Sequence, residues 1–227
     1  MSTTPSPRTA LIVHAHPEPR SFSTAQMRAA ERRLLAQGWA VTVTDLHAIG
    51  WDPVLTPLQF PAADRPFKPQ AEQMAAVRAG RLDPPVAEQL EALLQADLLV
   101  LSFPLWWFSV PAILKGWLDR VLVMGAVFGG DHGLFDEAAL TGRRAMLLLS
   151  TGGSADAFGP GSRFGDLEAL LYPIHHGTLG FVGYDVLEPV VTFAPAHGDD
   201  AVRATGLDSV GAAFDAIEDR RVLRLTT

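Results

Sequence analysis

The chain has 227 residues, a formal net charge of −7 and no cysteine. Its length, with 48% hydrophobic residues, is enough for a sizeable core in one domain. The acidic balance offers no basic surface for nucleic acid or anionic lipid, and the lack of cysteine excludes disulfides, cysteine-based zinc sites and thiol catalysis.

Residues 1–8 are rich in Ser, Thr and Pro and contain no apolar run, so we predict a flexible N-terminal tail and no signal peptide. A single domain over residues 9–222 is expected to follow. The longest apolar stretch, Leu98–Val110, is broken by serine and proline and is too short to span a bilayer. We therefore expect a cytoplasmic protein without membrane insertion.

Five strands are expected, separated by helical patterns. They are the segments Thr9–His14, Ala40–Asp45, Asp97–Phe103, Arg144–Ser150 and Val186–Phe193. All but the second are nearly continuous aliphatic runs, as is typical of strands buried on both faces of a parallel sheet. The pattern predicts a doubly wound α/β fold with a five-stranded parallel sheet and helices on both faces.

Five helical segments are expected between or after the strands. They cover residues 24–37, 72–95 with interruptions at Gly80 and Pro84, 110–124, 165–178 and 208–220. The segment Trp51–Asp83 is Pro-rich and has no clear period, which indicates a long excursion such as a lid or a dimer arm.

The helix over 110–124 has a recognisable buried face. Its apolar residues recur at spacings of three and four, as an amphipathic helix requires. They are Ile113, Leu114, Trp117, Leu118 and Val121. The same pattern assigns Lys115, Asp119 and Arg120 to the solvent face.

The loop between the first strand and the first helix carries hydroxyl groups at Ser21 and Ser23. It contains no glycine, so it is not the G-x-G-x-x-G turn of a dinucleotide-binding domain. Hydroxyls together with unpaired backbone N–H groups at a helix N-terminus favour a phosphate. The alternative is that one of the serines only caps the helix.

Three adjacent aromatic residues, Trp106, Trp107 and Phe108, follow the third strand. Isolated aromatic clusters are often part of the core. In open α/β sheets, however, ligands bind outside the carboxyl ends of the strands, which is where this cluster lies. Its position therefore favours a loop that contacts a flat aromatic ligand.

The fourth strand leads into the sequence Ser-Thr-Gly-Gly-Ser-Ala over residues 150–155. Its two glycines allow a ligand ring to approach the backbone closely, although an ordinary turn is the alternative. Three strand ends thus carry a hydroxyl loop, an aromatic loop and a Gly-Gly loop. Together they predict a site for a phosphate and a planar ring.

Competing chemistries lack their motifs. The chain has no G-x-S-x-G nucleophile elbow and no phosphate-binding P-loop. His175 and His176 are adjacent, so they point to different faces of a helix, and the sequence supplies no third ligand. We therefore predict no metal site.

Several segments match one known family in order along the chain. They are His14–His16 with Ser21–Ser23, Phe103–Phe108, Val110–Trp117, Thr151–Gly153 and Phe181–Pro189. From Ala10 to about Arg220, the sequence resembles the NAD(P)H:quinone oxidoreductases of the DT-diaphorase type.

The resemblance implies a flavodoxin-like fold, a homodimer and non-covalently bound FAD at the dimer interface, with FMN as the alternative. It implies two-electron, ping-pong hydride transfer from NAD(P)H to quinones or to other planar acceptors such as azo and nitro compounds. The residues that it implies for cofactor binding are His16, Ser21, Phe22, Ser23, Pro104, Leu105, Trp106, Trp107, Phe108, Thr151, Gly152 and Gly153. Those that it implies or suggests for the nicotinamide and quinone pocket are Trp107, Phe108, His132, Phe158, Phe164 and Phe181.

The sequence departs from the family at two positions. The family's proton-relay tyrosine and histidine align with Phe158 and Phe164, neither of which can donate a hydrogen bond. His132 is the candidate replacement donor, its alternative being an exposed loop residue. Two other functions stay open: a flavin-binding regulatory subunit of a potassium-efflux system, and an FMN electron carrier. The sequence does not choose between NADPH and NADH.

Overall fold

The computed structural model describes residues 6–60 and 66–225. Residues 1–5 of the expected tail and residues 61–65 of the expected excursion lie outside the described residues. The strands form one parallel sheet in the order β2-β1-β3-β4-β5, with β6 also paired to β4. Their bounds are β1 Thr9–His14, β2 Ala40–Asp45, β3 Leu98–Pro104, β4 Arg144–Thr151, β5 Asp185–Val186 and β6 Val190–Phe193. This order is the flavodoxin-like doubly wound arrangement, so the predicted fold class is confirmed.

The predicted fifth strand is divided in two. β5 pairs with the first residues of β4, and β6 pairs with its last four. Pro189 lies between them and has no N–H to continue the ladder. Arg220 instead fills the gap, because its Nε and Nη2 donate to the carbonyls of Glu188 and Pro189 at 2.6 and 2.8 Å. Both short strands share one side of β4, so together they take the position of a single fifth strand.

Six α-helices surround the sheet in the described part of the chain. They are α1 Phe22–Ala36, α2 Pro69–Arg78, α3 Pro84–Gln95, α4 Ala112–Val121, α5 Leu167–Ile174 and α6 Asp200–Asp215. α5 continues as a π-helical turn, η4 His175–Gly180. α6 begins eight residues before the predicted 208, because the Asp199 carboxylate caps it by accepting from the N–H of Val202 at 2.9 Å. None of the described helices is both long and apolar enough to cross a membrane.

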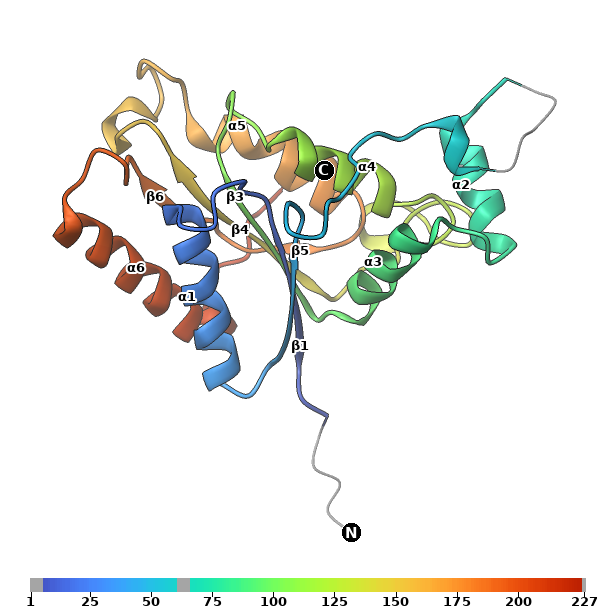
Figure 1. Cartoon of the computed structure of the whole chain (residues 1–227), viewed down its shortest axis with the longest axis horizontal. Helices are drawn as coiled ribbons and strands as arrows, with labels where there is room; N and C mark the ends of the chain where they lie inside the picture. The colour runs from blue at the N-terminus through green and yellow to red at the C-terminus, as the bar shows by residue number, and fades with distance from the viewer. Residues whose placement is uncertain (1–5, 61–65, 226–227) are drawn as a thin grey trace, which may run out of the picture.

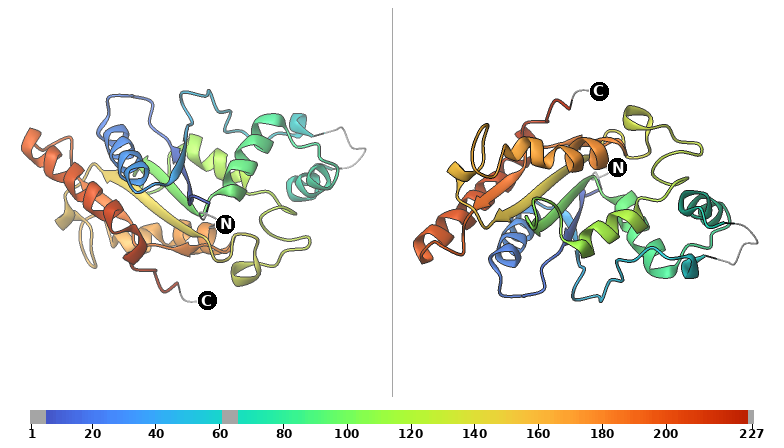
Figure 2. Two further views of the ribbon diagram at one scale, coloured as in Figure 1. Left: turned by 90° about the horizontal axis from the view of Figure 1, so that it is seen from below. Right: turned by 90° about the horizontal axis from the view of Figure 1, so that it is seen from above.

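The helices cover both faces of the sheet (Figures 1 and 2). α1 and α6 pack on one face, and α3, α4 and α5 pack on the other. The strands serve both cores by alternation: Leu11 and Val13 of β1 enter one core, while Ala10 and Ile12 enter the other. The sheet is thus buried on both sides, as the aliphatic runs predicted.

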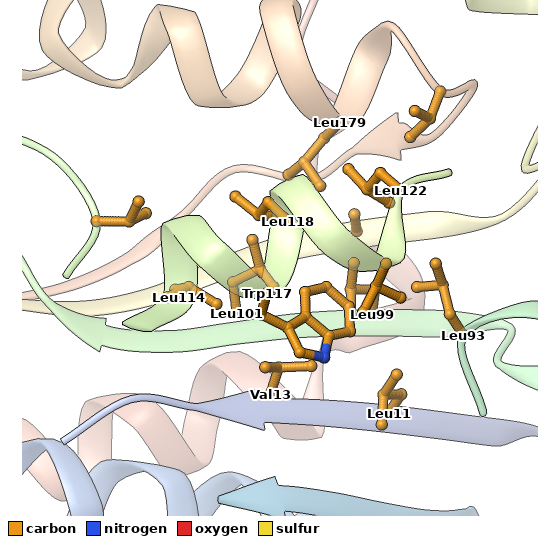
Figure 3. Close-up of a cluster of buried hydrophobic side chains, with 14 of the residues drawn as sticks. Leu11, Val13, Leu93, Leu99, Leu101, Leu114, Trp117, Leu118, Leu122 and Leu179 are labelled. Carbon is orange, nitrogen blue, oxygen red and sulfur yellow. The ribbon is translucent and has the colours of Figure 1, made fainter. Parts of the chain in front are cut away.

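The Trp117 side chain of α4 is fully buried against the sheet, among the leucines of β1 and β3 (Figure 3). Its indole N–H donates to Gln89 Oε1 of α3 at 3.2 Å. This packing fixes α4, and the aromatic loop that precedes α4 is thereby held at the carboxyl end of β3.

The prediction that Arg120 lies on the solvent face of α4 was wrong. Its side chain is only 4% exposed. It lies over the Trp51 ring at 4.8 Å, donates to the Asp52 carbonyl and pairs with the Asp83 carboxylate at 2.6 Å. The chain segment after β2 and the start of α3 cover this part of α4, which the periodicity of one helix cannot reveal.

Candidate functional site

The loops after β1, β3 and β4 meet at the carboxyl edge of the sheet (Figure 1). These strands are neighbours, with His14 of β1 opposite Ser102 and Pro104 of β3 opposite Ser150. The strand order reverses between β1 and β3, and this switch point is where open α/β sheets bind ligands. The predicted convergence of the hydroxyl, aromatic and Gly-Gly loops is therefore present.

The first turn of α1 forms an anion-binding geometry. Ser21 is its N-cap, and its hydroxyl oxygen accepts from the N–H of Thr24 at 3.1 Å. The backbone N–H groups of Phe22 and Ser23 come next and have no carbonyl one turn earlier in the helix. They can donate to a phosphate, which the positive end of the helix dipole also favours. The Phe22 ring itself points away, toward Gly206 of α6.

Two other predicted site residues near this turn, Ser23 and His16, make contacts within the chain. The Ser23 hydroxyl is buried and lies 2.9 Å from the Ser150 hydroxyl, so it ties α1 to the end of β4. His16 Nδ1 accepts from the N–H of Glu18 at 3.0 Å, and its ring centroid lies 6.0 Å from that of Trp106. Partial burial lowers the pKa of His16. His16 thus links the hydroxyl loop to the aromatic loop.

Sequence reasoning missed a buried histidine beneath this turn. His14, the last residue of β1, is fully buried, with Nδ1 3.0 Å from the Ser102 hydroxyl and Nε2 3.0 Å from the Thr24 hydroxyl. Burial lowers its pKa to about 4, so the ring is neutral at pH 7. A histidine within an otherwise aliphatic strand was the signal that could have identified it.

The aromatic loop is not part of the core. Trp107 is 96% exposed, and Trp106 and Phe108 are each more than 40% exposed. Trp106 and Ser109 exchange backbone hydrogen bonds of 3.1 and 3.0 Å, and the two residues between them have positive φ angles of 51° and 60°. This left-handed backbone costs about 1–2 kcal/mol for each non-glycine residue. Strained, exposed aromatic residues at a strand end indicate a contact outside the chain.

Two further predicted residues join this loop to the sheet. Pro104 is the buried last residue of β3. Leu105 is half-buried, and its N–H donates to the Ser150 carbonyl of β4 at 2.8 Å. The aromatic hairpin therefore starts from a fixed position at the edge of the sheet.

The Gly-Gly turn presents one open face and one closed face. The Thr151 hydroxyl donates to the Gly153 carbonyl at 2.8 Å and holds the turn. A Cβ at Gly152 would meet no atom within 4 Å, whereas one at Gly153 would lie 2.6 Å from Cε2 of Phe164. A planar ligand therefore has room to approach the backbone at Gly152.

Four phenylalanines form an aromatic wall: Phe108 follows β3, Phe158 and Phe164 lie in the loop after β4, and Phe193 ends β6. The ring centroids of Phe164 lie 5.8 Å from Phe108 and 5.4 Å from Phe158, and Phe158 lies 5.8 Å from Phe193. These four side chains carry no hydrogen-bond donor. The wall can bind a flat apolar molecule, but it cannot donate a proton.

Phe181 and His132 are not brought to this wall within one chain. Phe181 precedes β5, which pairs with the amino end of β4, and its carbonyl accepts from the N–H of Phe135 at 2.9 Å. His132 lies in the loop that leads into β4. The wall follows the carboxyl end of β4, whereas these two positions belong to segments that join the sheet at its amino end.

Phe181 belongs to a second aromatic group. Its ring centroid lies 5.3 Å from that of Phe128 and 5.6 Å from that of Phe135. Phe128 and Phe181 line a groove of about 320 Å³ together with Leu55, Leu118 and Leu122. The predicted pocket is thus divided into two separate parts of the chain.

Comparison with known proteins identifies relatives over most of the length. The family model for the flavodoxin-like fold matches residues 8–213. A ribosyldihydronicotinamide dehydrogenase (quinone) from Pongo abelii is 40% identical over 196 residues, covering 85% of this chain and 84% of the relative. NAD(P)H dehydrogenase (quinone) 1 from Cavia porcellus is 38% identical over 199 residues, covering 86% and 72%. A solved structure of a candidate quinone reductase from Klebsiella pneumoniae is similar with a TM-score of 0.89 and 32% identity, covering 95% of this chain and 86% of that one.

Proposed function

The chain belongs to the flavodoxin-like NAD(P)H:quinone oxidoreductase family, and on that premise we propose that it is a flavin-dependent NAD(P)H dehydrogenase that reduces quinones. The observation that carries the proposal is the strained, exposed hairpin at Trp107 and Phe108, beside an open backbone edge at Gly152. A flavin bound there would supply the hydride chemistry of the reaction.

The residues present fit a phosphorylated planar cofactor. The unpaired N–H groups of Phe22 and Ser23, in the turn that Ser21 caps, would bind the phosphate. Residues 104–108 would lie against one side of the ring, with His16 beside Trp106. Thr151, Gly152 and Gly153 would meet the ring edge with backbone groups, because Gly152 leaves that approach open.

The aromatic wall of Phe108, Phe158 and Phe164 would select flat acceptors. Quinones, azo compounds and nitro compounds all present a planar face to such a surface. The wall also excludes water from the place where nicotinamide and acceptor bind in turn. Protonation of the product would then depend on backbone N–H groups or on groups from outside this wall.

We propose FAD as the cofactor, on the strength of the family resemblance, and a cytoplasmic location, where NAD(P)H is available. Release of the flavin by heat and its separation by chromatography distinguish FAD from FMN. A purified protein with only FMN would correct the cofactor and leave the reaction class unchanged.

We also propose a homodimer. In one chain, Phe181 and His132 lie at the opposite end of β4 from Phe164, and the exposed hairpin is left open. A second copy could place its Phe128 and Phe181 group against the hairpin and close the site. Light scattering that showed a monomer at micromolar concentration with full activity would contradict this.

The decisive experiment is an absorption spectrum of the purified protein, followed by oxidation of NADPH and of NADH with menadione. We expect flavin bands near stoichiometry and menadione-dependent oxidation of at least one nucleotide. Leu35→Ala, an exposed change at the far end of α1, should preserve both. A wild-type protein without flavin, or without menadione-dependent turnover, would refute the proposed function.

A further inference from the structure

The imidazole of His14 joins three elements beneath the hydroxyl loop. It is fully buried at the end of β1. Its Nδ1 lies 3.0 Å from the hydroxyl of Ser102 on β3, and its Nε2 lies 3.0 Å from the hydroxyl of Thr24 on α1. The ring is therefore the polar connection between the sheet and the helix whose first turn would hold the phosphate.

The Thr24 hydroxyl is shared among several partners. It donates to the Glu18 carbonyl at 3.2 Å and lies 2.9 Å from the Ser21 hydroxyl. Once its single proton is donated to Glu18, it can only accept from His14. This arrangement requires the imidazole proton on Nε2 and leaves Nδ1 to accept from the Ser102 hydroxyl.

The hydrogen bonds of Ser21 follow from the same argument. Its oxygen already accepts from the N–H of Thr24 at 3.1 Å. Because Thr24 gives its proton to Glu18, the Ser21 hydroxyl is the donor in its 2.9 Å contact with Thr24, which fixes the Ser21 side chain as the cap of the helix. The orientation of Ser21 thus depends on a ring that no ligand would touch.

We propose that His14 is a positioning residue, whose neutral Nε2–H tautomer orients Thr24 and, through it, the Ser21 cap, so that the first turn of α1 holds its N–H groups in place for the phosphate of the flavin. The proposal rests on the proposed function, since it names how that site holds its cofactor. A buried polar ring is costly unless its hydrogen bonds are made, and an aliphatic residue would otherwise fit this strand. Two well-placed hydroxyl partners explain why a histidine is stable there.

Burial also keeps the ring in the required neutral form at physiological pH. The charged and titratable groups that face it are Asp45 at the end of β2, His16 and His47. Asp45 opposes the lowering, whereas the two histidines add to it. Desolvation is the largest cause, so the neutral form dominates above about pH 5.

The test compares flavins with and without a phosphate. Protein stripped of its cofactor is reloaded with FMN or with riboflavin, and each dissociation constant is measured by flavin fluorescence. His14→Asn can reach only the Nδ1 position, whereas His14→Gln can reach the Nε2 position and keep a donor to Thr24. We expect His14→Asn to weaken FMN about tenfold and His14→Gln to restore most of that loss, with riboflavin unchanged in both.

Two further variants keep the test decisive if changes at His14 impair folding. Thr24→Val removes the hydroxyl at nearly constant volume and should also weaken FMN about tenfold without affecting riboflavin. Thr24→Ser restores the hydroxyl and should restore FMN binding. His175→Asn, a change at another buried histidine, should leave the ratio of the two affinities unchanged.

Equal losses for FMN and riboflavin in His14→Asn would show a general packing role and overturn the proposal. Unchanged FMN binding in both His14→Asn and Thr24→Val would overturn it as well. If the wild-type protein binds neither flavin, the proposed function itself fails. The two failures are distinct, because the first requires a wild type that binds FMN.

Discussion

The edge of the Phe164 ring occupies the space that a side chain at Gly153 would need. An added Cβ would lie 2.6 Å from Phe164 Cε2 and 3.1 Å from Phe158 Cε2. Gly153→Ala should therefore lower the free energy of unfolding by about 1–3 kcal/mol through overpacking. Urea unfolding of the flavin-free protein measures this.

Gly152→Ala is the matched control, because no atom lies within 4 Å of its added Cβ. We expect it to change stability by less than about 0.5 kcal/mol, yet to weaken flavin retention if the ring approaches there. Equal destabilisation by the two variants would show that Phe164 does not restrict position 153.

Trp107→Gly separates stability from function. Glycine adopts the positive φ of 51° without penalty, and a side chain that is 96% exposed contributes little packing. We expect the melting temperature to stay the same or rise, while NAD(P)H oxidation falls at least tenfold. Unchanged turnover and unchanged flavin content would place Trp107 outside the site.

The double variant Phe158→Tyr/Phe164→His restores hydrogen-bond donors to the aromatic wall. A donor directed at charge that develops in a transition state is worth about 3 kcal/mol, or roughly a hundredfold in rate. We therefore expect faster reduction by NAD(P)H in stopped-flow measurements, with each single variant giving a smaller gain. If the double variant reacts at the wild-type rate, the lack of a donor was never limiting.

Two buried histidines predict an acid-sensitive fold. Burial lowers the pKa of both His14 and His175 to about 4, below the ordinary value of 6.5. Their contribution to the free energy of unfolding is present above pH 6.5. It is lost as the pH falls toward 4, because these histidines take up protons at a higher pH in the unfolded chain than in the folded protein. Each histidine can account for about 3 kcal/mol of this pH-dependent free energy of unfolding.

Urea unfolding at pH 7, 5.5 and 4.5 tests this dependence. The slope of stability against pH should decrease in His14→Leu and decrease further in the double variant with His175→Leu. A wild-type protein whose stability stays constant between pH 6.5 and 4.5 would contradict the prediction.

Arg120 and Lys115 offer a matched pair on α4. Arg120 is buried against Trp51 and Asp83, whereas Lys115 pairs with Asp119 in solvent. Arg120→Met should cost about 1.5–3 kcal/mol, because the Asp52 carbonyl and the partly exposed Asp83 carboxylate lose their charged hydrogen-bond donor. Lys115→Met should cost less than about 1 kcal/mol. Similar decreases in melting temperature for the two variants would show that the contacts of Arg120 stabilise the fold no more than the exposed Lys115–Asp119 pair does.

The sequence by itself determined the fold class, because aliphatic runs and helical periods are properties of single elements. It also determined that hydroxyl, aromatic and Gly-Gly loops share one edge, since consecutive parallel strands carry their carboxyl ends to the same side. The aromatic loop over residues 106–108 and the Gly152–Gly153 turn were predicted from residues adjacent in the chain, whereas the positive φ at Trp107 was found only in the structure.

Only the tertiary structure decided which side chains are covered by distant segments. Asp52 lies 68 residues from Arg120, and Ser102 lies 88 residues from His14, so no local period could reveal either contact. Packing also separated Phe181 from Phe164 within one chain, although the family resemblance had placed both in one pocket. These outcomes depend on how the elements pack in three dimensions. The residue pattern of one helix or strand does not show which distant segments contact it.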